Sequence, residues 1–379
     1  MAVRALARVN LAAIERNVAR LRGGLTGGAG LCAVVKADGY GHGAVPVARA
    51  ALAGGARLLA VATAVEAASL RAGGIQAPVL VMGALSDDEL PVAVGAGAEL
   101  VAWNDRFVSH LVRVLHADGG RSARVHVKLD TGMGRLGTRE LDEAARLAER
   151  VAGTAPALEL AGAMTHFASA DEDPEFTAAQ LARFTPFVRY VRDHWPRVVV
   201  HAANSAATLR EPASHFDFVR CGIAVYGCDP MNQDPLLHQL EPALELSSYV
   251  AAVKRAAPGD SAGYGRWWVA SAPTWLATVP IGYGDGIRRG LTNNSEVIIG
   301  TRRFPLVGAV SMDNITVEVG SGDAVRCGDR VTIIGAGEGG GERVTAEELA
   351  RRIDTINYEI VCGISARVPR VYHRDGVPA

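Results

Sequence analysis

The feature that most limits what this chain can fold into is a series of eight short apolar runs before residue 221, separated by segments of helical pattern. Each run is almost continuous in apolar residues, which is typical of a strand buried on both faces of a parallel sheet. The runs are LCAVVK at 31, RLLAVA at 57, PVLVM at 78, AELVA at 98, RVHVKLD at 124, LELAGAM at 158, VVVHA at 198 and FDFVR at 216. Eight strand–helix units predict a (β/α)8 barrel, for which ~250 residues is typical. A doubly wound open sheet is the alternative, and the number of units alone does not exclude it.

The pattern changes after residue 240, where short strand-like runs follow one another with turn signals between them. Within this part, TAEELARRI alone has a helical pattern, opened by Thr345 with Glu348 three residues later. At the other end of the chain, we expect a short strand and then a helix capped by Asn10. The sequence therefore predicts two domains without a low-complexity linker: a barrel over 1–240 and a mainly β domain over 241–379.

Composition excludes several classes of function. The net charge is -1, with 39 basic and 40 acidic residues, so neither nucleic acid nor an anionic membrane is expected as a partner. Five cysteines without a CxxC pair argue against a disulfide framework or a zinc site, and we expect no metal. The first residues lack the apolar core of a signal peptide, and no apolar run is long enough to span a membrane. We therefore expect a cytoplasmic protein.

The segment GAGEGG at 335–340 matches the glycine pattern of dinucleotide-binding loops. No following helix and strand complete a βαβ unit, and a lone match to this pattern is weak. Three glycines so close together suit a hairpin turn better, and the hairpin is our prediction.

Polar residues recur where the predicted barrel strands end, which is where barrel enzymes carry their chemistry. A single polar residue at a strand end is commonplace, but five strands here end in this way. These residues are Lys36, Lys128, Arg135, His166, His201, Asn204, Ser205, Arg220 and Gly222. Ser205 and the amides of Gly222 and Ile223 follow the last two strands, where barrels usually bind phosphate. A buried lysine such as Lys36 is suited to a Schiff base, because desolvation frees its amine. A phosphorylated aldehyde, pyridoxal 5'-phosphate (PLP), requires both features.

Eight motifs extend this interpretation to the whole chain. They are AVVKADGYGHG, DTGMGRLG, THFA, HAANSAA, VRCGIAVYG, VPIGYGDG, SMDN and INYEI, and in this order they resemble the bacterial alanine racemases. The resemblance implies a PLP-binding barrel, a C-terminal β domain and a homodimer whose active sites use residues of both chains. It also implies interconversion of L- and D-alanine, which supplies D-alanine for peptidoglycan.

The resemblance assigns two catalytic bases, because racemisation removes a proton from one face of the α-carbon and returns one to the other. Lys36 would bind PLP covalently and act on one face. Tyr264 in SAGYGRWW, supplied by the partner subunit, would act on the other. A tyrosine has an ordinary pKa of ~10, so its surroundings must assist, and His166 is the family histidine that pairs with it. His42, in the first motif, is expected to be structural.

Arg220 corresponds to the family residue that faces the pyridine nitrogen of PLP, and His201 supports it. Because arginine keeps its proton up to a pH above ~12, the ring nitrogen should stay unprotonated. The ring is then a weaker electron sink, which disfavours transamination. Together the residues expected to bind the cofactor are Lys36, Tyr40, Arg135, His166, Asn204, Ser205, Arg220, Gly222, Ile223 and Tyr358.

The same resemblance assigns the substrate-binding residues. Arg135 would contact the substrate carboxylate and the ring oxygen of PLP, and Met312 and Asp313 would come from the partner chain. Tyr283, with Tyr358, would narrow the access to the site and favour small amino acids. Lys128 is the candidate for carbamylation, which would turn a repelling cation into an anion that pairs with Arg135.

Two departures from the family motifs, Cys221 and Gly284, carry no functional group in the mechanism. Three alternatives remain at this point: a racemase of another small amino acid such as serine, a PLP-dependent decarboxylase, and a non-catalytic PLP carrier. Arg220 counts against the decarboxylase, which would need an acid at the pyridine nitrogen. The residues after 240, among them Tyr264, Met312 and Asp313, would have no purpose in a carrier. A small pocket discriminates only modestly between alanine and serine, by about 100-fold.

Overall fold

The computed structural model describes residues 4–321 and 325–379, and the chain divides into two compact units. The barrel unit comprises Ile14–Gly39 and Ala44–Val225, and the β unit comprises Met1–Ala13, Tyr40–Gly43 and Tyr226–Ala379. This division differs from the domain boundary expected at residue 240. Part of the difference arises because the first strand pairs with strands of the β unit, and the short segment Tyr40–Gly43 also belongs to that unit.

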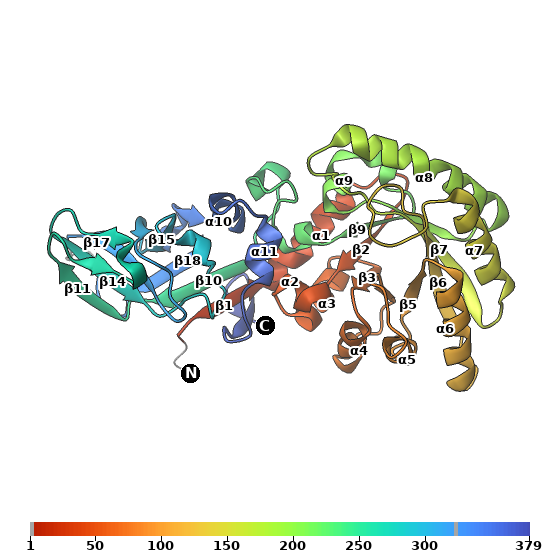
Figure 1. Cartoon of the computed structure of the whole chain (residues 1–379), viewed down its shortest axis with the longest axis horizontal. Coiled ribbons are helices and arrows are strands. Elements are labelled where there is room, and N and C mark those ends of the chain that lie inside the picture. Colours follow the sequence, from red (N-terminus) through yellow and green to blue (C-terminus); the bar gives the residue numbers. More distant parts are fainter. Residues whose placement is uncertain (1–3, 322–324) are drawn as a thin grey trace. The chain divides into compact units, whose positions relative to one another are not determined.

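Within the described residues, eight parallel strands close into the predicted barrel (Figure 1). They are β2 (Gly30–Val34), β3 (Leu58–Val61), β4 (Val79–Val81), β5 (Glu99–Ala102), β6 (Ala123–Lys128), β7 (Leu158–Met164), β8 (Val199–His201) and β9 (Phe218–Cys221). The barrel closes where β2 pairs with β9, with Cys32 opposite Arg220. Every residue of β2 to β5 is buried, which explains the continuous apolar runs that predicted these strands.

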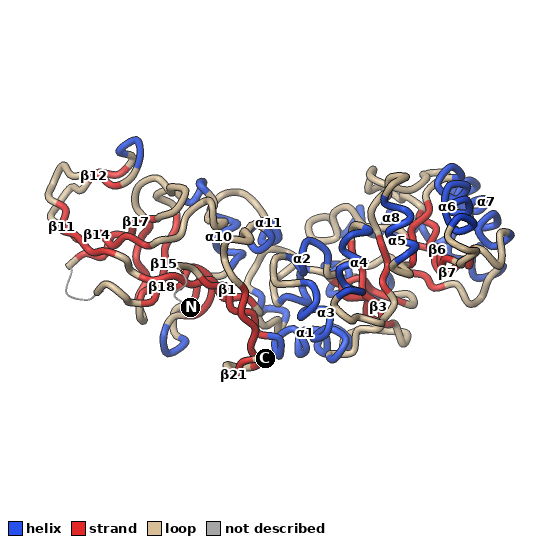
Figure 2. The backbone as a smooth tube through the Cα atoms, turned by 90° about the horizontal axis from the view of Figure 1, so that it is seen from below, coloured by secondary structure: helices blue, strands red, loops and turns tan. Residues whose placement is uncertain are grey.

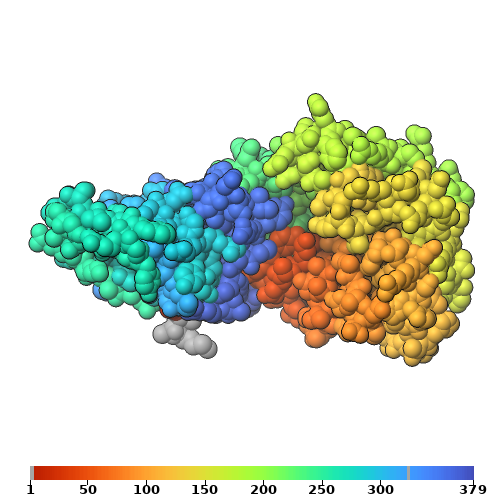
Figure 3. Space-filling view, viewed as in Figure 1, coloured from red at the N-terminus to blue at the C-terminus, as the bar shows by residue number. Residues whose placement is uncertain are grey.

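Helices follow the strands and cover the outside of the barrel, as the tube in Figure 2 shows by the blue segments around the red strands. They are α1 (Leu11–Gly23), α3 (Ala44–Ala53), α4 (Ala64–Ala72), α5 (Glu89–Gly95), α6 (Asp105–Ala117), α7 (Leu141–Gly153), α8 (Pro174–His194) and α9 (Ser205–Arg210). Side chains such as Leu111 and Leu115 place the apolar stripe of α6 against the sheet. Thr63 and Glu66 form a capping box that begins α4. On the face seen in Figure 3, the surface of the barrel unit is formed by residues coloured from orange through yellow to yellow-green.

The β unit contains an eleven-stranded sheet among its described residues. Its strands are β1 (Leu6–Asn10), β10 (Leu244–Tyr249), β11 (Ala252–Ala256), β14 (Thr274–Val279), β15 (Ser295–Ile299), β16 (Arg302–Leu306), β17 (Ile315–Gly320), β18 (Arg330–Ala336), β19 (Arg343–Val344), β20 (Arg370–Arg374) and β21 (Val377–Pro378). A small hairpin, β12 (Ser261–Ala262) with β13 (Trp268–Val269), stands apart from it. Two helices, α10 (Ala346–Arg352) and α11 (Asn357–Cys362), belong to the same unit. The sequence predicted α10 with its Thr345 cap, which accepts from the amide of Glu348, but not α11.

The glycine-rich segment at 335–340 connects two antiparallel strands. Gly335 on β18 pairs with Val344 on β19, so the chain reverses directly after β18. The predicted hairpin is confirmed, because β19 returns antiparallel to β18 after a connection that contains one short 3-10 helix, Glu338–Gly340.

Candidate active site

The turn after β2 presents Lys36 at the carboxyl end of the barrel. The short helical segment α2 (Lys36–Tyr40) contains four consecutive residues with positive φ, at +51° for Ala37 and Asp38, +61° for Gly39 and +52° for Tyr40. Left-handed backbone is costly for alanine and aspartate, so surrounding contacts must hold it. The amide of Ala37 donates to Glu66 Oε1 at 2.6 Å, and Asp38 Oδ1 accepts from the amide of Ala44 at 2.8 Å. The sequence predicted a buried lysine, but Lys36 is half-buried at the rim. It is partly exposed because it lies beyond the last residue of β2.

Arg220 on β9 is the most enclosed charged group of this end, with 3% of its surface exposed. Its Nη1 donates to His201 Nδ1 at 2.8 Å. Its Nη2 donates to the carbonyls of Thr165 and Ala202 at 2.8 and 2.9 Å and lies 3.1 Å from His166 Nδ1. Burial lowers the pKa of Arg220 to about 10, which still leaves the guanidinium charged at neutral pH. Within the described residues, its buried Nε has no hydrogen-bond partner. The structure therefore holds a cation whose Nε–H remains available to a ligand.

His166 follows β7 and faces the same guanidinium. Burial, with the positive charges of Arg220 and Lys128, lowers the pKa of His166 well below its ordinary value. The ring is therefore neutral, and Nδ1 accepts from Arg220, so the ring proton is on Nε2. The positive charges of Arg135 and Lys36 also lower the pKa of His166, so cations that follow three other predicted strands lie near this ring.

Lys128 is the last residue of β6 and is buried. Burial, and then the cations Arg220 and Arg135, lower the pKa of Lys128 to about 8. The following loop is organised by Asp130, whose carboxylate accepts from the amides of Gly132, Met133 and Gly134 at 2.8 to 3.1 Å. Burial opposes ionisation of Asp130, but these hydrogen bonds outweigh it and lower its pKa. This loop carries the exposed Arg135.

The residues predicted to bind phosphate meet at the ends of β8 and β9. Ser205 Oγ accepts from the amide of Gly222 at 2.9 Å and from that of Ala224 at 3.4 Å. Asn204 caps α9 by accepting from the amide of Ala207 at 3.0 Å. Gly222 and Ile223 are buried beside them. Ser205 and its neighbouring amides thus lie at the loops where barrels usually bind phosphate.

Two histidine and carboxylate contacts of this site were not predicted. His126 lies on β6. Its Nδ1 lies 2.8 Å from Nε2 of His201, and its Nε2 lies 2.7 Å from Oε2 of Glu99. The alternation of side chains along a strand could have indicated His126, because it lies two residues before Lys128 and so shares its face. No sequence signal marked Glu99, which opens a strand and resembles an ordinary solvated charge.

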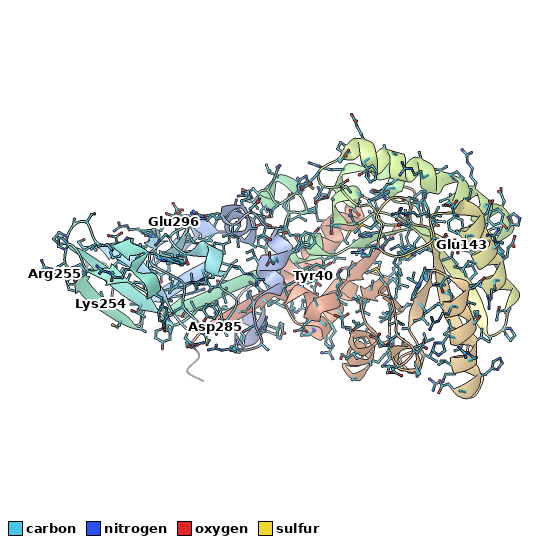
Figure 4. All side chains as sticks on the ribbon, viewed as in Figure 1. Tyr40, Glu143, Lys254, Arg255, Asp285 and Glu296 are labelled. Carbon is cyan, nitrogen blue, oxygen red and sulfur yellow. The ribbon has the colours of Figure 1, made fainter. Side chains whose placement is uncertain are left out.

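The remaining predicted residues belong to the β unit. The rings of Tyr40 and Tyr226 lie 4.9 Å apart, and Tyr358 on α11 lies 6.1 Å from Tyr40. Figure 4 labels Tyr40, and the close packing of this turn requires Gly41, where an added Cβ would approach the carbonyl of Val361 to 2.4 Å. Tyr40, Tyr226 and Tyr358 therefore form one aromatic cluster.

Tyr264, Tyr283 and Met312 are exposed in the single chain, at 76%, 45% and 52%. Tyr264 opens a short 3-10 helix between β12 and β13. Asp313, next to Met312, accepts from Arg367 at 2.6 Å and from Arg4 at 3.3 Å. Arg4 also binds Asp285, which is labelled in Figure 4, at 2.7 Å. Ionic contacts therefore fix the loop that carries Met312, while its side chain is left exposed.

The fold and the site define a barrel enzyme with a mainly β C-terminal domain and a cationic, histidine-containing centre at the carboxyl ends of its strands. Residues 9–230 match the family described as "Alanine racemase, N-terminal domain", and residues 243–372 match "Alanine racemase, C-terminal domain". The chain belongs to the alanine racemase family. The family and the barrel-plus-β architecture predicted from the sequence are thus confirmed.

Individual relatives support the same assignment over nearly the full length. The chain is 43% identical to an alanine racemase of Thermobifida fusca, covering 97% of each sequence. It is 41% identical to one of Halalkalibacterium halodurans, covering 97% of this chain and 95% of the relative. An alanine racemase structure from a D-cycloserine-producing Streptomyces lavendulae superimposes with a TM-score of 0.92 at 36% identity, covering 98% of each chain. One from Bacillus anthracis with bound L-Ala-P gives 0.91 at 38% identity, covering all of this chain and 97% of that one.

Proposed function

We propose that the protein interconverts L- and D-alanine with PLP held at the carboxyl end of the barrel, using one base from each subunit of a homodimer. The family assignment makes it an isomerase acting on alanine. The decarboxylase and the cofactor carrier considered from the sequence are not favoured, because the relatives over the full length are racemases. The arrangement of Arg220 carries the assignment of the cofactor.

Arg220 provides the test of whether PLP fits. A buried N–H without a partner costs free energy, so the Nε of Arg220 should donate to something that binds here. A pyridine nitrogen is a planar acceptor that can take this hydrogen bond when it carries no proton. The residues that would hold the rest of the cofactor are Lys36 for its aldehyde, Arg135 for its ring oxygen, and Tyr40, Asn204, Ser205, Gly222, Ile223 and Tyr358 around its phosphate. When bound, PLP would supply an electron-withdrawing ring that acidifies the α-proton of the attached amino acid.

The proton transfers are assigned to this chain's own side chains. Lys36 moves a proton on one face of the α-carbon, and Tyr264 of the partner subunit moves one on the other. His166 keeps its ring proton on Nε2, since Nδ1 accepts from Arg220. We assign this N–H to the oxygen of Tyr264, where a donated hydrogen bond would stabilise the tyrosinate and so lower the pKa of the base.

Substrate orientation is assigned to groups from both subunits. Arg135 would pair with the carboxylate of alanine, and the backbone amide of Met312 of the partner subunit would add a second donor, with Asp313 fixing that loop. Lys128 would react with carbon dioxide, because a pKa near 8 leaves a substantial neutral amine at physiological pH. The carbamate would replace one of three crowded cations by an anion. Tyr283 and Tyr358 would restrict access to small amino acids.

Three properties of the single chain support the wider assignment. The exposed side chains Tyr264, Trp267, Tyr283 and Met312 are large and apolar, as expected of a surface that a partner covers. The five cysteines, all in described parts of the chain, are free, which suits a reducing cytoplasm. Among the described residues no helix is long and apolar enough to cross a membrane. We assign the enzyme to the cytoplasm, supplying D-alanine for peptidoglycan.

The experiment that tests this function follows isotope and chirality together. The purified protein, loaded with PLP, is incubated with L-alanine in deuterated water, and the α-proton signal and the D-enantiomer are measured over time. We expect deuterium at the α-carbon and D-alanine rising to equal amounts, with serine reacting more slowly by roughly 100-fold or less. A protein that binds PLP and leaves alanine unchanged would contradict the proposal.

A further inference from the structure

A continuous chain of buried hydrogen bonds leads from Arg220 through the interior of the barrel to a carboxylate. Arg220 Nη1 lies 2.8 Å from His201 Nδ1, and His201 Nε2 lies 2.8 Å from His126 Nδ1. His126 Nε2 lies 2.7 Å from Glu99 Oε2, and Glu99 Oε1 accepts from Arg124 Nε at 2.9 Å. The exposed fractions are 3% for Arg220, 1% for His201, 2% for His126 and 8% for Glu99. These hydrogen-bonded side chains, from Arg220 to Glu99, are therefore shielded from bulk water.

The strands of the barrel leave room for this row of hydrogen-bonded side chains. Its members come from four strands, β9, β8, β6 and β5, and the register of β6 against β7 shifts between Val125 and His126. On β7, Gly162 faces the ring of His126, and a Cβ added there would approach His126 Nδ1 to 2.0 Å. A glycine is thus required at this point by the imidazole, not by the backbone, because the φ of Gly162 is not in the left-handed region.

The protons that these groups carry give each hydrogen bond between Arg220 and Glu99 one direction. Arg220 can only donate, so His201 Nδ1 carries no proton, and His201 keeps its proton on Nε2. That proton is donated to His126 Nδ1, which must be bare, and His126 therefore carries its proton on Nε2 and donates it to Glu99. The reverse direction would place two donors together at Arg220 and two acceptors together at Glu99. Both ends enforce the same pair of neutral tautomers.

Electrostatics is consistent with this direction. Burial, then the positive charge of Arg220, lowers the pKa of His201 well below its ordinary value, so this ring is neutral. Burial opposes ionisation of Glu99, but its contacts with His126 and Arg124 outweigh burial and lower its pKa. The acceptors that contact Arg220 directly are two carbonyls and two neutral rings. Within the described residues, no carboxylate contacts Arg220, and the relay of two imidazoles connects it to Glu99.

We propose that Glu99 and His126 are positioning residues for the ring-nitrogen end of the PLP site: by fixing the tautomer of His201, they hold Arg220 in place with its Nε left for the ring nitrogen. This inference rests on the proposed function for the identity of the ligand. The relay itself does not depend on the cofactor. Without Glu99, His201 could place a proton on Nδ1, which would repel Arg220 and loosen the guanidinium.

The first test reads the tautomers in the wild-type protein without PLP. Nitrogen NMR of protein labelled with 15N-histidine distinguishes Nδ1–H, Nε2–H and doubly protonated rings, and single substitutions assign the signals. We expect both His126 and His201 to be neutral with the proton on Nε2 near neutral pH. A proton on Nδ1 of either ring would overturn the proposal, whatever the enzyme's activity. A wild-type protein that fails to racemise alanine would instead refute the proposed function and leave this result intact.

The second test asks whether the relay affects the cofactor. Displacement of Arg220 would let the ring nitrogen accept a proton, which strengthens the electron sink and favours transfer of the amino group to the aldehyde carbon of PLP, with release of pyruvate. Glu99→Gln removes the charge and offers an amide that donates as readily as it accepts. We expect the yield of pyruvate per racemisation event to rise about tenfold, the effect of one hydrogen bond to a charged group.

Glu159→Gln is the matched control. Glu159 contacts the same Arg124 but not His126, and its side chain is 59% exposed. The Glu159→Gln variant should give the same yield of pyruvate as the wild type. An equal pyruvate yield in Glu99→Gln and the wild type would reduce Glu99 to a structural partner of Arg124 and overturn the proposal.

Discussion

The carboxyl end of the barrel and the exposed loops of the β unit hold their functional side chains in opposite ways. Arg220 is buried, with both terminal nitrogens hydrogen-bonded within one chain. Tyr264 and Met312 are exposed, although the loop of Met312 is fixed by ionic contacts of Asp313. The barrel side of the proposed site is thus organised within one chain. The exposed groups of the β unit, Tyr264 and Met312, would need a second subunit beside them to take part in a site. The difference is what a catalytic site shared between subunits requires.

The largest effect is expected from Lys36→Ala on the barrel side. Loss of the amine removes both the covalent link to PLP and one base, and a positioned base alone contributes about 10² to 10⁴ in rate. We expect racemisation to fall by at least a thousandfold or so on this basis, with loss of the yellow colour of the bound cofactor. Lys254→Ala is the control, because Lys254 is exposed on β11 (Figure 4) and should change neither property. A yellow and active Lys36→Ala protein would refute the assignment.

Tyr264→Phe probes the β-unit side and should have a smaller, one-sided effect. The variant keeps the ring and loses the acidic oxygen, so racemisation should fall by about 10²- to 10³-fold while PLP stays bound. Exchange of the α-proton with deuterated water should continue for one enantiomer and be lost for the other. Tyr249→Phe, at a tyrosine 39% exposed on β10, provides the control. Undiminished racemisation in both directions would show that one base suffices.

Combining the two variants tests whether the two sides come from different chains. In a mixed dimer of Lys36→Ala and Tyr264→Phe subunits, one site has both defects and the other has both bases. Random pairing of co-expressed subunits should therefore restore about a quarter of the wild-type activity from two nearly inactive proteins. A mixture as inactive as its components would place both bases in the same chain and break the contrast between the two regions.

The sequence predicted the barrel well because its strands are buried on both faces and therefore appear as continuous apolar runs. It did not place β1 in the β unit, since the alternating burial of Leu6–Asn10 shows a half-buried strand but not its partners. Helix α11 has six residues, too few for a helical period to be recognised. Local pattern thus predicts an element better than it predicts which sheet the element joins.

The site shows the same limit. Motifs pointed to Lys36, His166 and Arg220, and the structure brings these barrel residues into one electrostatic cluster. Glu99 was missed because its burial follows from closure of the barrel, which places His126 against it from the neighbouring strand. The left-handed backbone at Ala37 and Asp38 was also missed, because residues other than glycine rarely adopt this conformation and no local pattern marks it here. The roles of the site residues stay predictions until the substitutions above are measured.

The smallest effect we predict concerns Lys128, through stability in the absence of carbon dioxide. Burial and the neighbouring cations lower its pKa in the folded chain to about 8, whereas an unfolded lysine titrates near 10.4. Between these values the unfolded chain binds more protons than the folded one, so the contribution of Lys128 makes the free energy of unfolding rise with pH from about 8 to about 10. Below pH 8 the cost of the buried cation is fully present.

Lys128→Gln should therefore flatten this rise by up to about 3 kcal/mol, measured by urea denaturation across that window in bicarbonate-free buffer. Exposed Lys254→Gln should follow the wild type at every pH. Adding bicarbonate near neutral pH should stabilise the wild type and leave Lys128→Gln unchanged, because only the wild type can replace the cation by a carbamate. If bicarbonate stabilised both proteins equally, Arg135 would have to be held by another group, and the barrel side would be complete without modification.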